Sequence, residues 1–429
     1  MTTGSDGSTL VLKGGRVLDG SGERFADVAI RDGVVAAVAG DLTGDRILDA
    51  SGCVVAPGLV DLHTHLREPG REEAETVESG SRAAALGGYT AVVAMPNTTP
   101  TVDSAAVVTE IRTLARRALC DVEVAGAITV GRQGERLAPM AELASMGVRL
   151  FTDDGSGVND VGLMRRALEY ASDLGVTLAQ HCEVAELSRG TCMHEGAVSA
   201  RLGLAGQPAE AEELMVMRDI ALVRLTGARM HFLHMSTAGS IATIDAAKSA
   251  GLPVTCEVAP HHFTLTDECC SSFDPVFKVH PPLRTSDDVA AVKAGLRRGT
   301  VDAIATDHAP HPANEKELPF DQAPPGMLGL EYALALALTE LDLSVAEVLA
   351  LLSWRPAAIA GIADRHGAVA PGRVANLCVI DPTATWTIDA SGGASRSRNV
   401  PYVGREVRGR VRHTVHRGVP VVIDAVAQR

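Results

Sequence analysis

The chain has 429 residues, 46% of them hydrophobic and 21% charged, and a formal net charge of −14. This composition is typical of a globular α/β protein with one large core and a smaller one, and the acidic balance argues against nucleic-acid binding, which requires clustered Lys and Arg. No apolar run is long enough to span a membrane, no signal-peptide pattern begins the chain, and its eight cysteines form no CxxC pair, so we expect a cytoplasmic protein with reduced thiols.

Three regions of the chain differ in their pattern. Residues 1–56 consist of short alternating apolar and polar runs broken by Gly and Asp, which predict antiparallel strands and hairpins. In residues 57–365, apolar strands alternate with helical stretches, and residues 366–429 return to short alternating runs. We expect the two ends of the chain to pair into one small β-sandwich domain.

The central region predicts eight strands, at 60–65, 90–95, 122–127, 148–152, 177–181, 230–234, 254–257 and 303–306. Helix-like segments lie between them. Eight strand–helix units over roughly 300 residues favour a (β/α)8 barrel of the TIM type. The predicted fold class is therefore α/β, a barrel with a β domain built from both chain ends.

Metal-ligand residue types fall at the carboxyl ends of these strands, where barrel enzymes carry their chemistry. His63 and His65 end the first strand, and because residues i and i+2 of a strand point to the same side, both imidazoles can face one point. The ligand-type residues that end later strands are Asp153, Asp154, His181, His234 and Asp307. Each alone has a structural alternative, such as an Asp that caps a turn. Their coincidence on one rim favours a metal site of imidazole and carboxylate ligands.

The motifs DLHTHLREPG, AMPNTTP, FTDDG, AQHCE, HFLHMST, CEVAPHHF and TDHAPH, in this order, resemble the amidohydrolase superfamily and, within it, the bacterial dihydroorotases of the long-chain type. The resemblance covers essentially the whole chain. It implies reversible cyclisation of N-carbamoyl-L-aspartate to L-dihydroorotate plus water, a step of de novo pyrimidine (UMP) biosynthesis.

The resemblance implies two metal ions per subunit, zinc with manganese or cobalt as possible substitutes, and six ligands: His63, His65, Asp154, His181, His234 and Asp307. The first two histidines and Asp307 would hold one ion, and the other two histidines the second. Asp154 would bridge the ions, with Asp153 as the alternative bridge. A hydroxide between the ions would attack the ring carbonyl, and Asp307 would act as the general acid/base.

The resemblance also implies how the substrate is held. Arg67 would bind the carboxylate outside the ring through two parallel hydrogen bonds. The other expected contacts are His65, Asn97, His280, His311, Pro325 and Gly326. His280 stands before the PPLR run, where the family usually has Asn, so a different group faces the ring oxygen there.

Three functions remain open. The first is dihydroorotase. The second is dihydropyrimidinase (hydantoinase) or allantoinase, whose rings lack the carboxylate that Arg67 would bind. The third is an inactive structural partner of aspartate transcarbamoylase, although such proteins typically lose metal ligands and this chain has all six. We expect a small-molecule substrate and a homo-oligomer, a dimer, with a possible complex with aspartate transcarbamoylase.

Overall fold

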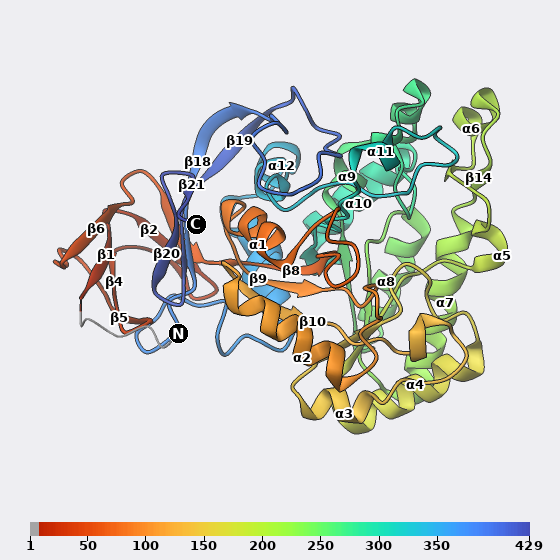
Figure 1. Cartoon of the computed structure of the whole chain (residues 1–429), viewed down its shortest axis with the longest axis horizontal. Helices are drawn as coiled ribbons and strands as arrows, with labels where there is room; N and C mark the ends of the chain where they lie inside the picture. The colour runs from red at the N-terminus through yellow and green to blue at the C-terminus, as the bar shows by residue number, and fades with distance from the viewer. Residues whose placement is uncertain (1–7) are drawn as a thin grey trace.

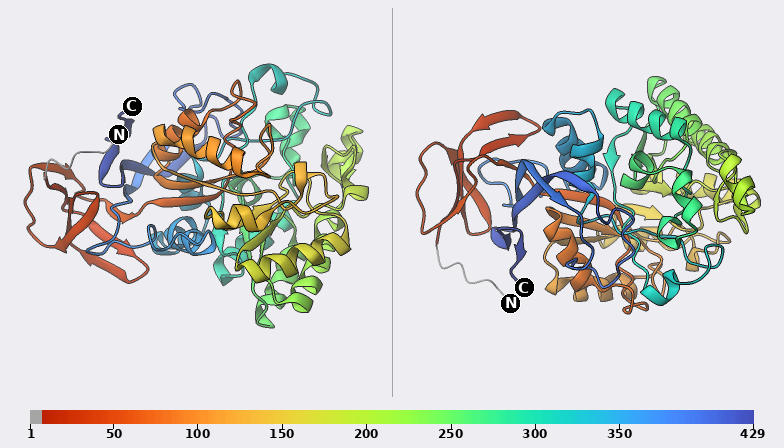
Figure 2. Two further views of the ribbon diagram at one scale, coloured as in Figure 1. Left: turned by 60° about the horizontal axis from the view of Figure 1, so that its bottom comes forward. Right: turned by 90° about the horizontal axis from the view of Figure 1, so that it is seen from above.

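The structure is a computed structural model that describes residues 8–429, so the first seven residues of the predicted region 1–56 lie outside the described part. The molecule has a β-rich end and a larger part in which helices surround strands (Figure 1). The strands of the β-rich end come from both ends of the chain, drawn red and blue in Figures 1 and 2. Among the described residues, no helix is long and apolar enough to cross a membrane.

The two chain ends share one sheet. Strand β7 (Val54–Pro57) pairs antiparallel with β18 (Leu377–Thr387) and parallel with β2 (Arg16–Asp19). The other strands of this sheet are β3 (Gly22–Phe25), β19 (Glu406–His416), β20 (Val419–Ile423) and β21 (Val426–Ala427). A second sheet contains β1 (Leu10–Lys13), β4 (Asp27–Arg31), β5 (Val34–Ala39) and β6 (Arg46–Asp49). The buried apolar cluster that includes Leu12, Val55 and Val379 joins the two sheets, so strands from both ends of the chain pair and pack together.

In the central region, β13 (Met193–His194) and β14 (Gly206–Gln207) form a small parallel sheet of their own. The other eight strands are also parallel: β8 (Leu59–Thr64), β9 (Tyr89–Ala94), β10 (Asp121–Val124), β11 (Leu150–Thr152), β12 (Thr177–Gln180), β15 (Met230–Phe232), β16 (Val254–Val258) and β17 (Ala303–Ile304). These eight strands form two sheets, β10-β9-β8 and β11-β12-β15-β16-β17. Isolated parallel bridges join Gly126 to Phe151 and Thr64 to His308, so the strand order continues across both gaps. Each strand overlaps a predicted one, in the order expected of a (β/α)8 barrel.

Helices follow the strands. The longer ones are α1 (Val77–Leu86), α2 (Ala105–Leu114), α4 (Val161–Leu174), α7 (Glu210–Thr226), α8 (Ala238–Ser249), α10 (Ser286–Arg298) and α12 (Ala333–Glu340). The short ones include α3 (Met140–Ser145), α5 (Ala185–Ser188), α6 (Ala197–Leu202), α9 (Pro260–Thr264), α11 (Ala313–Lys316), α13 (Val345–Leu349) and α14 (Arg355–Ile359). Several begin at side-chain caps that the sequence supplies: Thr76, Asp160, Thr237 and Thr285 each accept a hydrogen bond from the backbone N–H three residues on.

An irregularity in β8 affects the orientation of the first histidine. Val60 and Leu62 pack in an apolar cluster with Ala357 and Ile362. The pairing of β8 with β9 shifts register between Asp61 and Thr64, so strict alternation of side chains does not extend to His63, whose Nδ1 lies 3.0 Å from Glu257 Oε1 of β16.

The eighth strand is shorter than the predicted 303–306. Thr306 donates both its backbone N–H and its hydroxyl to Asp61, each at 2.7 Å, and the next residue, Asp307, has a φ of 46°. The chain therefore leaves the strand after Ile304 and turns Asp307 into the site.

Candidate metal centre and substrate cavity

The structure brings the six predicted metal ligands into one buried cluster at the carboxyl ends of the strands. All six residues are buried, with an exposed fraction of at most 6%. Asp154 Oδ1 lies 3.3 Å from both His63 Nε2 and His181 Nδ1, and 3.6 Å from His234 Nε2. It therefore lies between histidines of the two expected metal positions.

Asp307 completes the cluster from the other side. Its Oδ1 lies 3.2 Å from His65 Nε2 and 3.5 Å from His63 Nε2. The ligand atoms of His63, His65 and Asp307 lie within 4.8 Å of one another, as do those of His63, Asp154 and His234. Each group could hold one metal ion; the two groups share His63, and His181 belongs to neither.

Asp153 faces away from the cluster. Its Oδ1 accepts hydrogen bonds from the backbone N–H groups of Ile128 (2.8 Å) and Thr129 (3.0 Å), and its Oδ2 accepts the Thr129 hydroxyl. The carboxylate that was the alternative bridge thus ties the loop after β11 to the loop after β10.

Three of the histidines have the proton of one ring nitrogen fixed by an acceptor oxygen. The pairs are His63 Nδ1 with Glu257 Oε1 (3.0 Å), His65 Nδ1 with Asn97 Oδ1 (2.9 Å) and His181 Nε2 with Glu183 Oε2 (3.0 Å). A neutral imidazole that donates from one nitrogen presents a lone pair at the other. In all three rings that second nitrogen faces Asp154 or Asp307, as a metal ligand must.

Glu257 and Glu183 were missed by the sequence reasoning. Glu257 is fully buried and also accepts from His231 Nε2 at 3.0 Å, so His231 is a buried hydrogen-bonding residue and not a member of the cluster. A carboxylate inside the apolar strand VTCEV, and a Glu two residues after His181 in HCE, were the available signals.

The electrostatics of the cluster suit a cation. Burial raises the pKa of Asp154, but attraction to His63 and the closeness of the His181 and His234 imidazoles outweigh this and hold it well below its ordinary value. Burial likewise opposes the ionisation of Asp307, yet His63 and His65 lower its pKa overall. Burial lowers the pKa of His63, but Asp154 and Asp307 raise it well above its ordinary value. Both carboxylates are therefore ionised and attract positive charge.

Three buried atoms of the cluster have no hydrogen-bond partner in the described part of the chain: His63 Nε2, Asp154 Oδ1 and His234 Nδ1. Buried polar atoms are normally satisfied, so unpartnered ones among ligand-type groups indicate a missing partner. Imidazole nitrogens with carboxylate oxygens are a donor set that zinc, manganese or cobalt accepts. The residues present fit a divalent metal centre.

The backbone around the site is strained at three residues. Arg67, His234 and Asp307 have φ angles of 62°, 37° and 46°, a region that residues other than glycine rarely adopt. Such conformations persist where the surrounding structure enforces them and are concentrated at functional sites.

A cavity of about 210 Å³ opens onto the cluster. Its wall includes every predicted substrate contact: His65, Arg67, Asn97, His280, His311, Pro325 and Gly326. Arg67 donates from Nε to Pro310 O at 3.1 Å, and its Nη2 lies 3.2 Å from His311 Nε2. Burial and the nearby Arg71 lower the pKa of Arg67 to about 10, so it is cationic at neutral pH.

Two of the predicted contacts have features that the sequence did not reveal. The Gly326 N–H donates to Lys278 O at 2.9 Å and is already engaged, whereas Pro325 O lies 2.9 Å from His311 Nε2. His280 Nδ1 lies 3.9 Å from Glu183 Oε1, and its buried Nε2 has no hydrogen-bond partner among the described residues. His280 therefore reaches the carboxylate that orients His181.

Comparisons with known proteins agree with this geometry. Residues 52–240 match the family described as Dihydro-orotase-like. The chain is 47% identical to a dihydroorotase of Pelotomaculum thermopropionicum and 48% identical to one of Streptomyces coelicolor, in each case over 97% of this chain and 99% of the relative. Among solved structures, L-hydantoinase (dihydropyrimidinase) from Arthrobacter aurescens superimposes with a TM-score of 0.88 at 25% identity, over 98% of this chain and 97% of that one. The sequence identity along nearly the full length shows that the chain belongs to the dihydroorotase family.

Proposed function

We propose that this protein is a metal-dependent cyclic amide hydrolase, a dihydroorotase that interconverts N-carbamoyl-L-aspartate and L-dihydroorotate in pyrimidine biosynthesis. The observation that carries the proposal is Arg67, a cationic guanidinium in the wall of the cavity that opens onto the metal-ligand cluster. Hydantoins, dihydrouracil and allantoin lack the carboxylate that dihydroorotate carries outside its ring. A buried cation at this place therefore favours dihydroorotate over the uncharged rings.

In the proposed centre, His63, His65 and Asp307 would hold one ion, His181 and His234 would hold the other, and Asp154 would contribute to both. When bound, two zinc ions polarise a ring carbonyl and lower the pKa of a water molecule, and manganese or cobalt are possible substitutes. Glu257, Asn97 and Glu183 each accept a hydrogen bond from one ring nitrogen of a histidine, which orients the other nitrogen toward Asp154 or Asp307.

Asp307 is the proposed general acid/base. Its pKa is held below its ordinary value, so it enters the hydrolytic reaction ionised and can take the proton of the attacking water. Returning that proton to the ring nitrogen releases N-carbamoyl-L-aspartate. In the cyclisation direction the same oxygen takes the proton from the carbamoyl nitrogen and gives it to the departing water.

Arg67 and His311 form the proposed carboxylate subsite. Burial and the charge of Arg67 lower the pKa of His311 to about 3, so its ring is neutral. A neutral His311 ring can exchange its hydrogen bond with Arg67 or Pro325 O for one with the substrate carboxylate, without adding a charge to the subsite. Asn97, held by His65, and His280 line the remaining wall and are the proposed contacts for ring amide and carbonyl groups, together with the backbone at Pro325 and Gly326.

The wider assignment follows from the same observations. We propose a closed (β/α)8 barrel at 57–365 and a split β-sandwich from 1–56 and 366–429. An inactive structural role is disfavoured because the ligand cluster is complete. A homodimer, a complex with aspartate transcarbamoylase and a cytoplasmic location remain proposals, the last of them supported by eight free cysteines.

Replacing Arg67 with Met tests the substrate. Loss of the paired, charge-assisted hydrogen bonds should lower kcat/KM for dihydroorotate by roughly 30-fold to several-thousand-fold, about 2–5 kcal/mol of transition-state binding. Metal content should not change, and any slow turnover of dihydrouracil should be nearly unaffected. Arg165→Met is the matched control, because Arg165 is exposed, pairs with Glu169 and lies outside the cavity. Equal losses on charged and uncharged rings would overturn the substrate assignment.

A further inference from the structure

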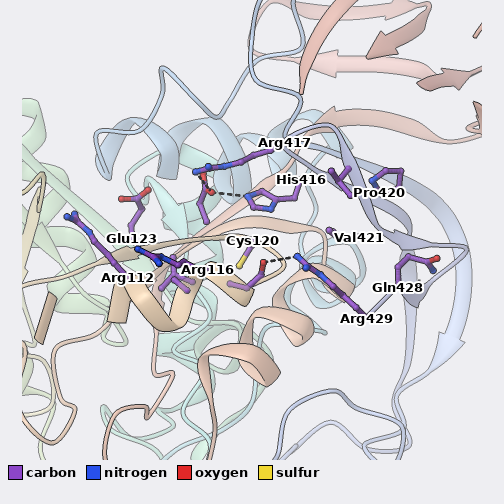
Figure 3. A pocket seen from close by; sticks show the side chains of 15 residues that line it. Arg112, Arg116, Cys120, Glu123, His416, Arg417, Pro420, Val421, Gln428 and Arg429 are labelled. Carbon is purple, nitrogen blue, oxygen red and sulfur yellow. Dashed lines mark hydrogen bonds and ion pairs between the residues drawn. The ribbon is translucent and has the colours of Figure 1, made fainter. Parts of the chain in front are cut away.

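A second, larger cavity of about 680 Å³ lies away from the metal-ligand cluster, and the two cavities share no wall residue. It lies between the end of α2 with the following helical turn (Ala115–Arg117), the start of β10, and the C-terminal strands β19 and β20 (Figure 3). Because Asp121 begins β10, this cavity is at the amino end of the barrel strands, whereas the metal ligands follow their carboxyl ends.

The wall of this cavity is rich in arginine in a chain whose net charge is −14. Arg112 and Arg116 extend from the α2 side, and Arg417 and Arg429 extend from the C-terminal strands opposite (Figure 3). These guanidinium groups form a positively charged region on a protein whose net charge is negative, and such a region attracts anions.

The two carboxylate side chains in the wall are already paired. Asp121 Oδ1 lies 2.8 Å from both His416 Nε2 and Arg417 Nη2, and Glu123 Oε1 lies 2.8 Å from Arg365 Nη2. Asp121 is 7% exposed. These carboxylates are thus not available to neutralise further cations in the wall.

Two arginines of the wall have no protein partner in the described part of the chain. Arg112 and Arg116 are exposed, and among the described residues they form no hydrogen bond or ion pair with any side chain. The guanidinium of Arg429 has a single weak contact, 3.4 Å from Nη2 to Ala118 O. Guanidinium groups in this state match the geometry and charge of a phosphate group, which accepts paired hydrogen bonds.

The wall also has an apolar part. Val419, Pro420, Val421 and Ala115 contribute to it, and the volume exceeds what one inorganic phosphate ion fills. Cavities of several hundred Å³ with a few polar anchors are typical of sites for small organic ligands. We propose that this cavity binds a phosphate-bearing small molecule, whose phosphate is held by arginines of the α2 side, Arg112 and Arg116, which are four residues apart in the chain.

Isothermal titration calorimetry on the metal-loaded protein at low ionic strength tests the proposal, with inorganic phosphate, adenosine 5′-monophosphate, uridine 5′-monophosphate and the nucleoside adenosine as probes. We expect at least one phosphate-bearing probe to bind with a Kd below about 1 mM and adenosine not to bind. Tighter binding of a nucleotide than of phosphate identifies an organic phosphate as the ligand, and equal affinities identify free phosphate. No binding of any phosphate-bearing probe overturns the proposal.

The Arg112→Ala/Arg116→Ala double variant locates the site. The Kd of this variant for the phosphate-bearing probe should rise at least about tenfold, since charge-assisted hydrogen bonds are lost. Its kcat/KM for dihydroorotate, measured without phosphate, should stay at the wild-type level. Arg117→Ala is the matched control, because Arg117 is adjacent in the chain but lies outside this wall. An unchanged Kd in the double variant would place the anion elsewhere, for example at the metal centre. An equal rise in Kd for Arg117→Ala would mean that the anion is attracted by the general positive charge of this surface and not by a specific site. Either result overturns the site.

Discussion

Asp153 and Asp154 are neighbours in the chain, yet their carboxylates serve opposite sides of the loop that follows β11: one accepts backbone N–H groups of residues 128 and 129, and the other lies among the histidines of the candidate metal centre. Replacing each by Ala should therefore give different defects. Asp154→Ala should deplete the metal. Asp153→Ala should retain it and lose about 1–3 kcal/mol of stability, because two buried N–H groups lose their acceptor. Metal analysis and thermal melting of both variants distinguish the outcomes, and the reverse pattern would make Asp153 the metal ligand.

Metal removal tests the centre as a whole. A chelator should abolish dihydroorotate turnover, and zinc or manganese should restore it, because the buried His63 Nε2 and Asp154 Oδ1 have no hydrogen-bond partner among the described residues and are the ligand atoms of the proposed ions. The measurement is activity against metal content during stepwise reconstitution. Full activity in a sample shown to be free of metal would exclude the proposed chemistry.

Asp307→Asn should remove the proton carrier while keeping the shape of the side chain. We expect kcat to fall by about 10²–10⁴-fold, with a larger loss if metal is also released. Asp302→Asn is a control, since Asp302 pairs with Lys248 and lies outside the substrate cavity. A variant at position 307 within about tenfold of wild type would assign the proton transfer to another group.

Glu257→Gln should weaken metal binding without touching a ligand. Its carboxylate accepts from both His63 and His231, and an amide can replace only one of these acceptors. Loss of such an orienting partner typically costs about 10–100-fold in metal affinity. Competition with a chromophoric chelator measures this change. Wild-type affinity in the variant would mean that Glu257 has only a packing role.

Lys316 supports the loop that lines the substrate cavity, donating from Nζ to Pro324 O at 3.0 Å and to Gly326 O at 3.2 Å. Burial and the nearby Lys278 lower the pKa of Lys316 from 10.5 to about 7. Between these values the unfolded chain binds the proton and the folded protein does not, so folding stability rises with pH across this window. The stability of wild type relative to Lys316→Met should therefore increase from about pH 7 to about pH 10 and stay flat below it. Melting temperatures of the two metal-loaded proteins across this range provide the measurement. A difference in melting temperature that does not change with pH would mean that the pKa of Lys316 is not lowered in the folded protein.

The strands and the six clustered ligands were predictable because both depend on local patterns: apolar runs, helical spacing, and polar residues at the points where strands end. The orientation of Asp153 against Asp154 was not, because it depends on N–H groups more than twenty residues away in the chain. The engagement of the Gly326 N–H by Lys278 and the reach of His280 to Glu183 are likewise tertiary contacts between separate loops. No short-range pattern encodes them.

The antiparallel pairing of β7 with β18, in which Pro57 lies opposite Leu377, has a consequence for biosynthesis. While the ribosome is still producing the central region, this edge of β7 has no strand to bond to, although His63 has already emerged. Contacts between residues so distant in sequence form slowly and leave apolar edges exposed in the meantime. Completion of the first sheet is thus a late event of translation, and nascent chains that stall in the central region should be the ones most dependent on chaperones.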